Sequence, residues 1–197
     1  MTVTAADYLW FEDGFPDLAE AYCFTLVKDL APAELLQRLD GEAGPSLTGV
    51  AALVEASYDL GDTQQLVAMA GVGRWTLMIE PNGCLGVSEE RALPASAGTT
   101  WISHFSNVNG LDSFLWAEDA TARLAFEPMF PDSRWGSTPD DQLGTMHRVG
   151  FHFGADAPET DQSVAAAFAL AESMTKVRPT PEFLCTAAFT CGSVRIR

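Results

Sequence analysis

Hydrophobic and polar residues alternate most regularly between Gly71 and Gly86. Within this stretch, residues 75–80 read WTLMIE, and every second side chain of an extended chain points to the same face. Met78, on the second face, indicates that both faces are covered. Pro81-Asn82-Gly83 then ends the run, because proline has no N–H to donate and Asn and Gly tolerate positive φ. The pattern predicts a strand at the centre of an antiparallel sheet.

Five other runs have the alternation, or the aromatic and β-branched content, that is typical of strands. They are Tyr22–Lys28, Gln65–Ala70, Thr99–Asn107, Ser113–Ala117 and Thr121–Glu127. Short connections such as Gly71-Val72-Gly73 and Asn109-Gly110 favour antiparallel pairing, since a parallel crossover needs a dozen or more residues. The order of the runs predicts a hairpin of residues 65–80, followed directly by a three-stranded meander over residues 99–127.

Helices are expected where apolar residues recur every three or four positions after a capping residue or proline. The expected helical segments are Pro32–Leu39, Leu47–Tyr58 after a Ser46 cap, one turn at Ser88–Arg91, Thr138–Gly150, a long helix from a Thr160-Asp161 cap to Val177, and Pro181–Cys185. Gly41–Ser46 is expected to be a loop.

The fold class predicted from these elements is α+β. A single domain over residues 1–197 would contain an antiparallel sheet of five or six strands, with helices packed mainly on one face. Residues 1–20 and 186–197 are expected to be peripheral segments. Aromatic residues would hold the first segment to the body of the protein, and the second would be frayed.

Sequence motifs for cofactor binding are incomplete. Gly71-x-Gly73 has Thr76 at the place of the third glycine of a dinucleotide fingerprint, and no helical pattern follows it. The chain also contains neither a P-loop nor a G-x-S-x-G sequence. We therefore expect no cofactor.

The charge balance narrows the classes of partner. The chain has 27 acidic and 11 basic residues, a net charge of −16. Attraction to phosphate dominates non-specific nucleic-acid affinity, so direct nucleic-acid binding and binding to an anionic membrane are disfavoured. A protein partner with a basic surface is expected instead, and a DNA mimic is an alternative that would need a continuous acidic face.

The expected location is the cytoplasm. No run approaches the roughly 18 apolar residues of a membrane span, and the acidic first 20 residues lack the pattern of a secretory signal. The four cysteines are therefore expected as reduced thiols, although the spacing of Cys185 and Cys191 permits a disulfide.

Three pairs of residues are candidates for catalysis or metal binding. Cys84 and His104 would need contact to form a thiolate–imidazole pair. His147 and His152 span a predicted helix end and do not share a helical face, so no metal site is expected. Glu80 and Glu127 each precede a proline at a predicted strand end, where two carboxylates can act as acid and base or simply bind loop amides. We predict no catalytic residue.

A binding site is expected where polar residues follow strand ends. Asn82, Asn107 and Asn109 all lie at turn signals, where the first role of an asparagine is turn geometry. Aromatic and arginine side chains are frequent interface anchors. The predicted binding residues are Trp75, Glu80, Asn82, Asn107, Asn109, Glu127, Arg134 and Trp135.

Several short strings together resemble a known family. They are YCFTLV before PAE in residues 22–34, WTL before EPNG in residues 75–83, NVN at 107–109, FEP before FP in residues 126–131, and ALAE at 169–172. The chain resembles an uncharacterised domain-of-unknown-function family of about 200 residues from high-GC bacteria. This resemblance implies no catalytic residue. The acidity is also similar to that of bacterial immunity and defence-associated modules.

The leading hypothesis is a non-catalytic binding module that recognises a protein partner, as an immunity- or defence-type accessory protein. The alternatives are a small enzyme or ligand binder with a carboxylate and histidine cleft, and an acidic DNA mimic. The oligomeric state is left open by the sequence.

Overall fold

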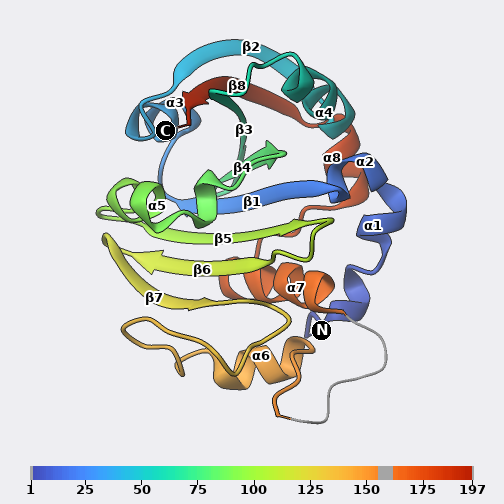
Figure 1. Cartoon of the computed structure of the whole chain (residues 1–197), viewed down its shortest axis with the longest axis vertical. Coiled ribbons are helices and arrows are strands. Elements are labelled where there is room, and N and C mark those ends of the chain that lie inside the picture. Colours follow the sequence, from blue (N-terminus) through green and yellow to red (C-terminus); the bar gives the residue numbers. More distant parts are fainter. Residues whose placement is uncertain (1, 155–161, 197) are drawn as a thin grey trace.

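The computed structural model describes residues 2–154 and 162–196, and its strands form one antiparallel sheet. The eight strands are ordered β2-β8-β3-β4-β1-β5-β6-β7, and Figure 1 shows the β2–β8 end curving over the strands next to it. The strands are β1 (Ala21–Lys28), β2 (Glu42–Thr48), β3 (Gln64–Val72), β4 (Trp75–Pro81), β5 (Thr100–Asn107), β6 (Ser113–Glu118), β7 (Thr121–Phe126) and β8 (Ala188–Arg195).

The strands β4 and β1 form the central pair of the sheet. The alternation of residues 75–80 predicted this central position for β4. All residues of β1 from Tyr22 to Val27 are buried, so this strand is covered on both faces. Phe24 lies opposite Ile79 of β4 and His104 of β5. Only a strand with apolar or hydrogen-bonded side chains on both faces can occupy such a position without a large desolvation cost.

Helices cover both faces of the sheet, with the larger share on one face. The first face packs against α1 (Trp10–Gly14), α2 (Pro16–Ala19), α4 (Val50–Tyr58), α6 (Leu143–Val149), α7 (Ser163–Thr175) and α8 (Pro181–Thr186). The second packs against α3 (Pro32–Arg38), the 3-10 turn η2 (Leu85–Val87) and α5 (Glu89–Ala95). The short 3-10 turn η1 (Ala5–Asp7) contacts α7.

The mixed fold class and the antiparallel sheet are confirmed, but the predicted number of five or six strands is wrong. The six predicted strands correspond to β1 and β3–β7, and β2 and β8 were missed. The predicted meander exists as β5-β6-β7, yet it does not directly follow the hairpin in space, because β1 lies between β4 and β5. Alternation identifies an extended segment and its faces, whereas pairing across long sequence separations depends on the whole sheet.

The segment predicted as a loop at Gly41–Ser46 is mostly the edge strand β2. Its register against β8 shifts between Ala43 and Ser46, on either side of Pro45. Proline is tolerated at an edge or a bulge because no ladder hydrogen bond is needed there. The helix that follows begins at Val50 rather than Leu47, since Gly49 has a positive φ of 73° and lies outside it.

The C-terminal segment, expected to be peripheral and frayed, contains β8. This strand pairs with β2 on one side and β3 on the other, and Phe189, Cys191 and Val194 are buried. In the N-terminal segment, Tyr8 and Phe11 are buried against Phe168 of α7.

A further predicted helix start differs from the structure. The helix expected from Thr138 begins at Leu143, because the chain before it bonds to β7, with the Thr138 N–H donating to the Arg123 carbonyl at 3.0 Å. The cap predicted at Thr160 and Asp161 lies outside the described residues. Within the part of the chain that the structure describes, no helix combines the length and apolar character needed to cross a membrane.

Candidate functional site

Five of the eight predicted binding residues lie at or just beyond one end of the sheet. This end is formed by the start of β1 and the ends of β4, β5 and β7: Tyr22 lies opposite Pro81, Ala21 opposite Asn107, and Phe114 opposite Phe126. The five residues are Glu80, Asn82, Asn107, Asn109 and Glu127. Figure 1 shows this end of the central strands beside α1 and α2.

The asparagines at this end hold turns together. Asn82 has a φ of 56°, and its side-chain amide donates to the Ser57 hydroxyl of α4 at 3.3 Å. The Asn107 side-chain oxygen accepts the backbone N–H of Asn109 at 2.9 Å and that of Leu111 at 3.2 Å. These contacts fit the structural role expected for turn asparagines, and they leave the Asn109 side chain exposed.

Glu80 is fully buried on the second face of the sheet, so its carboxylate does not reach the surface. Its two oxygens accept the backbone N–H groups of Leu85 and Gly86, each at 2.8 Å. Desolvation raises the pKa of this carboxyl to about 7, against the lowering effect of the two amide hydrogen bonds. The carboxylate therefore anchors the η2 turn to the sheet.

A small buried polar cluster lies on the same face. The Cys23 thiol is 3.3 Å from the Ser103 hydroxyl, which is itself 2.9 Å from the Thr25 hydroxyl. Burial raises the pKa of Cys23 well above its ordinary value, so its thiol stays protonated and weakly nucleophilic. Gly86 closes the cluster, since a Cβ there would lie 2.0 Å from the Thr25 hydroxyl oxygen. Such a tightly covered cluster is a packing feature rather than an open active site.

The pairs considered for catalysis are separated in the fold. Glu80 belongs to β4, and Glu127 follows β7 four strands away, which corresponds to about 19 Å at about 4.8 Å per strand. Cys84 precedes the η2 turn on the second face, whereas His104 packs on the first face against Phe168 of α7. Among residues 2–154 and 162–196, no group of three or more His, Cys, Asp or Glu side chains is placed to hold a metal ion.

His104 is enclosed by aromatic rings. Its ring centroid lies 4.3 Å from that of Phe168 and 5.7 Å from those of Tyr22 and Phe24, and the side chain is 3% exposed. Burial lowers the pKa of His104 to about 3, so the neutral form is present at physiological pH. Its Nδ1 atom has no hydrogen-bond partner among the described residues. His104 is therefore a packing residue of the core.

The remaining three predicted residues lie elsewhere. Trp75 pairs with Lys28 at the opposite end of the sheet, beside the Arg74–Asp29 ion pair. Trp135 pairs with Ala125 through two backbone hydrogen bonds of 2.8 Å, and it covers the outer edge of β7. Its neighbour Arg134 binds Asp140 at 2.6 Å. Both residues therefore secure the loop that protects this edge.

Sequence reasoning missed two exposed apolar side chains at the polar end of the sheet. Val108 and Leu111, in the β5–β6 turn, are 75% and 61% exposed. The Val108 N–H donates to the Glu20 carbonyl at 2.9 Å, which fixes the turn beside α2. The signal was present in the sequence, because two apolar residues interrupt the polar turn Asn107–Asp112.

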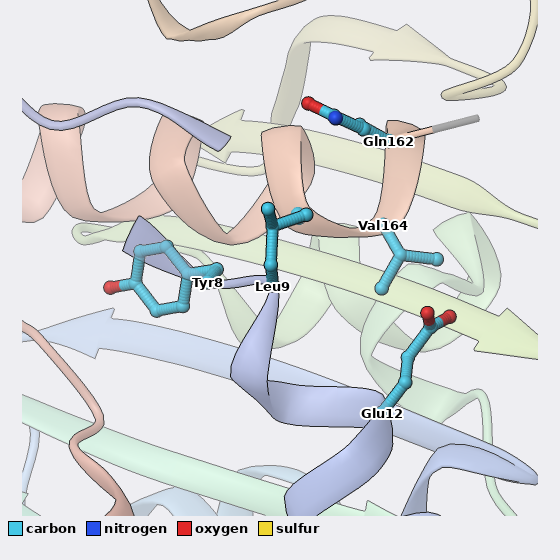
Figure 2. A pocket seen from close by; sticks show the side chains of 6 residues that line it. Tyr8, Leu9, Glu12, Gln162 and Val164 are labelled. Carbon is cyan, nitrogen blue, oxygen red and sulfur yellow. The ribbon is translucent and has the colours of Figure 1, made fainter. Parts of the chain in front are cut away.

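Two cavities lie close to this end of the sheet. One, of about 50 Å³, separates η1 and α1 from the start of α7, and Figure 2 shows Glu12 and Val164 pointing toward each other across it. It has room for one or two water molecules, at about 30 Å³ each in the liquid. The other, of about 210 Å³, lies between α2 and α4 and is open to solvent.

Comparison with protein families gives one match, over residues 1–197. The chain belongs to the family of unknown function DUF6461. No curated protein and no solved structure matches it. The expected membership of an uncharacterised family is thereby confirmed, and the DUF6461 assignment carries no catalytic or binding residues to transfer. Function has to be argued from the geometry above.

Proposed function

We propose that this DUF6461 protein is a non-catalytic binding module that recognises a protein partner with a basic surface, in the manner of an immunity- or defence-type accessory protein. The observation that carries the proposal is the β5–β6 turn, which presents Val108 and Leu111 to solvent beside a strongly acidic segment. Two neighbouring exposed apolar side chains form an apolar patch on this turn, and exposed apolar patches mark protein-interaction sites.

The charge distribution supports a basic partner. Residues 1–27 contain five acidic residues and no lysine or arginine, and this segment includes α2 and the adjacent Glu20, whose carbonyl accepts the Val108 N–H of the turn. An acidic rim around apolar anchors speeds association with a positively charged surface and disfavours nucleic acid. Glu80, Glu127 and His104, the residues of the alternative enzymatic hypothesis, do not converge on a common point.

The proposal is tested by affinity purification from the native cells at low ionic strength, using the full-length chain. Wild-type protein is expected to recover one partner in near-stoichiometric amount. A Val108→Ser/Leu111→Ser double variant is expected to lose it, because two anchors lose their apolar burial. Ile196→Ser is the matched control, since Ile196 is also exposed, at 44%, but follows β8.

Two outcomes would contradict the proposal. The first is that wild-type protein recovers no stoichiometric partner, and the second is that the double variant retains it as well as the control. If the partner is instead a DNA-binding protein and duplex DNA displaces it competitively, the DNA-mimic alternative is favoured.

A further inference from the structure

An apolar groove on the first face of the sheet lies between α2 and α4. It has a volume of about 210 Å³ and is lined by residues 14–18 and by Val50, Ala51 and Val54. Leu18, Val50 and Val54 form a buried floor, while Pro16 and Ala51 lie exposed at its rim. The groove is therefore a formed apolar surface between α2 and α4.

The size of the groove indicates what it accepts. An apolar cavity of about 150 Å³ is enough to bind a benzene ring, so this groove has room for one phenylalanine or leucine side chain. Cofactors and metabolites usually occupy sites of about 300–1,000 Å³. One anchoring side chain of a larger molecule fits the volume better than a whole small-molecule ligand.

The charge around the groove indicates which residues should flank the anchoring side chain in the partner. Residues 39–73, which include α4, contain no lysine or arginine, as residues 1–27 also do not. Eight exposed carboxylates of these segments have no ion pair in the part of the chain that the structure describes. Six of them lie on α1, α2 or α4 or at the C-terminal caps of α2 and α4: Glu12, Asp13, Asp17, Glu20, Glu55 and Asp59. Unpaired acids around an apolar groove complement a positively charged segment.

The groove is continuous with the end of the sheet described above. Ser57 near the end of α4 accepts a hydrogen bond from Asn82, and α2 leads directly into Glu20, which binds the turn carrying Val108. We infer that the α2–α4 groove receives an aromatic or large aliphatic anchor side chain from a partner's peptide segment in which lysines or arginines flank that anchor. This inference rests on the proposed function and specifies the chemistry of the partner.

The test uses two synthetic peptides and the full-length protein. The first peptide has nine residues, with one phenylalanine between four arginines and four lysines, and its twin has alanine at the centre. Fluorescence anisotropy at low ionic strength is expected to give about a tenfold lower Kd for the phenylalanine peptide, the fold-change expected from burying one phenyl ring. Amide NMR shifts in the labelled protein are expected at residues 15, 17, 18 and 50–54.

Two arginine variants form a matched pair. Ala51→Arg places a long charged side chain over the groove, and Ala33→Arg adds the same charge at the equivalent second position of α3, on the second face. Both alanines are exposed, so both variants are expected to fold. Ala51→Arg is expected to abolish the difference between the two peptides, whereas Ala33→Arg is expected to preserve it.

The inference is overturned if the two peptides bind wild-type protein equally, or if Ala51→Arg weakens phenylalanine-peptide binding no more than Ala33→Arg does. Purification from native cells with Ala51→Arg and with the Val108/Leu111 double variant separates failure of the groove from failure of the proposed function. A partner retained by Ala51→Arg but lost by the Val108/Leu111 double variant would overturn the groove and support the proposed function. A preference for the phenylalanine peptide in the absence of any native partner would support the groove and contradict the proposed function.

Discussion

Glu80 and His104 show how burial acts on single ionisable residues of this sheet. Both are enclosed, one on each face, and in both cases desolvation favours the neutral form. The pKa of the acid therefore rises to about 7, and that of the base falls to about 3. These shifts make the stability of the protein depend on pH.

Replacing His104 by phenylalanine is expected to reduce sensitivity to acid. With a folded-state pKa of about 3 against an ordinary 6.5, the neutral residue contributes stability above pH 6.5 that is lost as the pH falls toward 3. At pH 5 this loss is about 2 kcal/mol. Urea denaturation measures the free energy of unfolding at each pH. The decrease in this free energy from pH 7 to pH 5 is expected to be about 2 kcal/mol smaller in His104→Phe than in wild type.

His147→Phe is the control for this measurement, because His147 is exposed and its replacement leaves the buried ring in place. Glu80 is present in all three proteins, so its own opposite pH dependence between about pH 4.5 and 7 cancels in the comparison. Equal acid sensitivity in wild type and His104→Phe would contradict the assignment.

The glycine that covers the buried polar cluster offers a second test at the residue scale. In Gly86→Ala the new methyl group would lie 2.0 Å from the Thr25 hydroxyl oxygen and 2.6 Å from that of Ser103. Overpacking of this kind typically costs about 1–3 kcal/mol. Chemical denaturation is expected to show that loss. In Gly71→Ala, where no heavy atom lies within 4 Å, it is expected to show a change below about 0.5 kcal/mol. Equal costs at the two sites would contradict the tight cover.

At the scale of elements, β8 joins the edge strand β2 to the rest of the sheet. It pairs along its length with both β2 and β3, and its side chains Phe189 and Cys191 are part of the main core. Without it, β2 would have no strand partner and the β3 edge would be exposed to other chains.

Ending the chain after Ala187 is therefore expected to prevent folding. Far-UV circular dichroism and gel filtration should show loss of the cooperative thermal transition and aggregation. Removal of residues 196–197 alone is the control, since it leaves β8 complete, and a transition within a few degrees of wild type is expected. A cooperatively folded, monomeric product of the longer truncation would show that β8 is dispensable.

The whole molecule carries a net charge of −16, concentrated partly in two segments that lack any basic residue. Repulsion among such charges opposes the compact state, and salt screens it with a Debye length of about 10 Å at 0.1 M. The same field favours a positively charged partner, so binding and self-repulsion have a common origin in this protein.

Raising the NaCl concentration from about 20 to 200 mM is accordingly expected to increase the Tm by about 2–4 °C, which corresponds to about 1 kcal/mol for a chain of this size. Differential scanning fluorimetry measures the shift. Choline chloride at equal ionic strength should give the same result, because screening does not depend on the cation. A Tm that falls with either salt would contradict net repulsion as the dominant effect.

Much of the local structure followed from the sequence. Alternation identified β1 and β3–β7, and it correctly placed Trp75, Leu77 and Ile79 on one face with Met78 covered on the other. It succeeded because strand periodicity is a property of neighbouring residues. The family resemblance came equally from short local strings.

The candidate site was predicted less well from the sequence. The sequence placed Asn82 and Asn107 at the ends of predicted strands, and the structure brings both to one end of the sheet. It did not show that Glu80 turns inward to bind the η2 amides or that Trp135 covers the β7 edge. It also passed over Val108, Leu111 and the α2–α4 groove, whose exposure depends on residues far away in the chain.

The sequence by itself determined which segments are extended, which of their faces are apolar, and that the protein is acidic. Only the tertiary structure decided that β1 enters between β4 and β5, that β8 lies between β2 and β3, and that Glu80 and His104 are buried on opposite faces. The physical reason is that periodicity arises from adjacent residues, whereas strand order and burial depend on the free energy of the whole sheet and its covering helices.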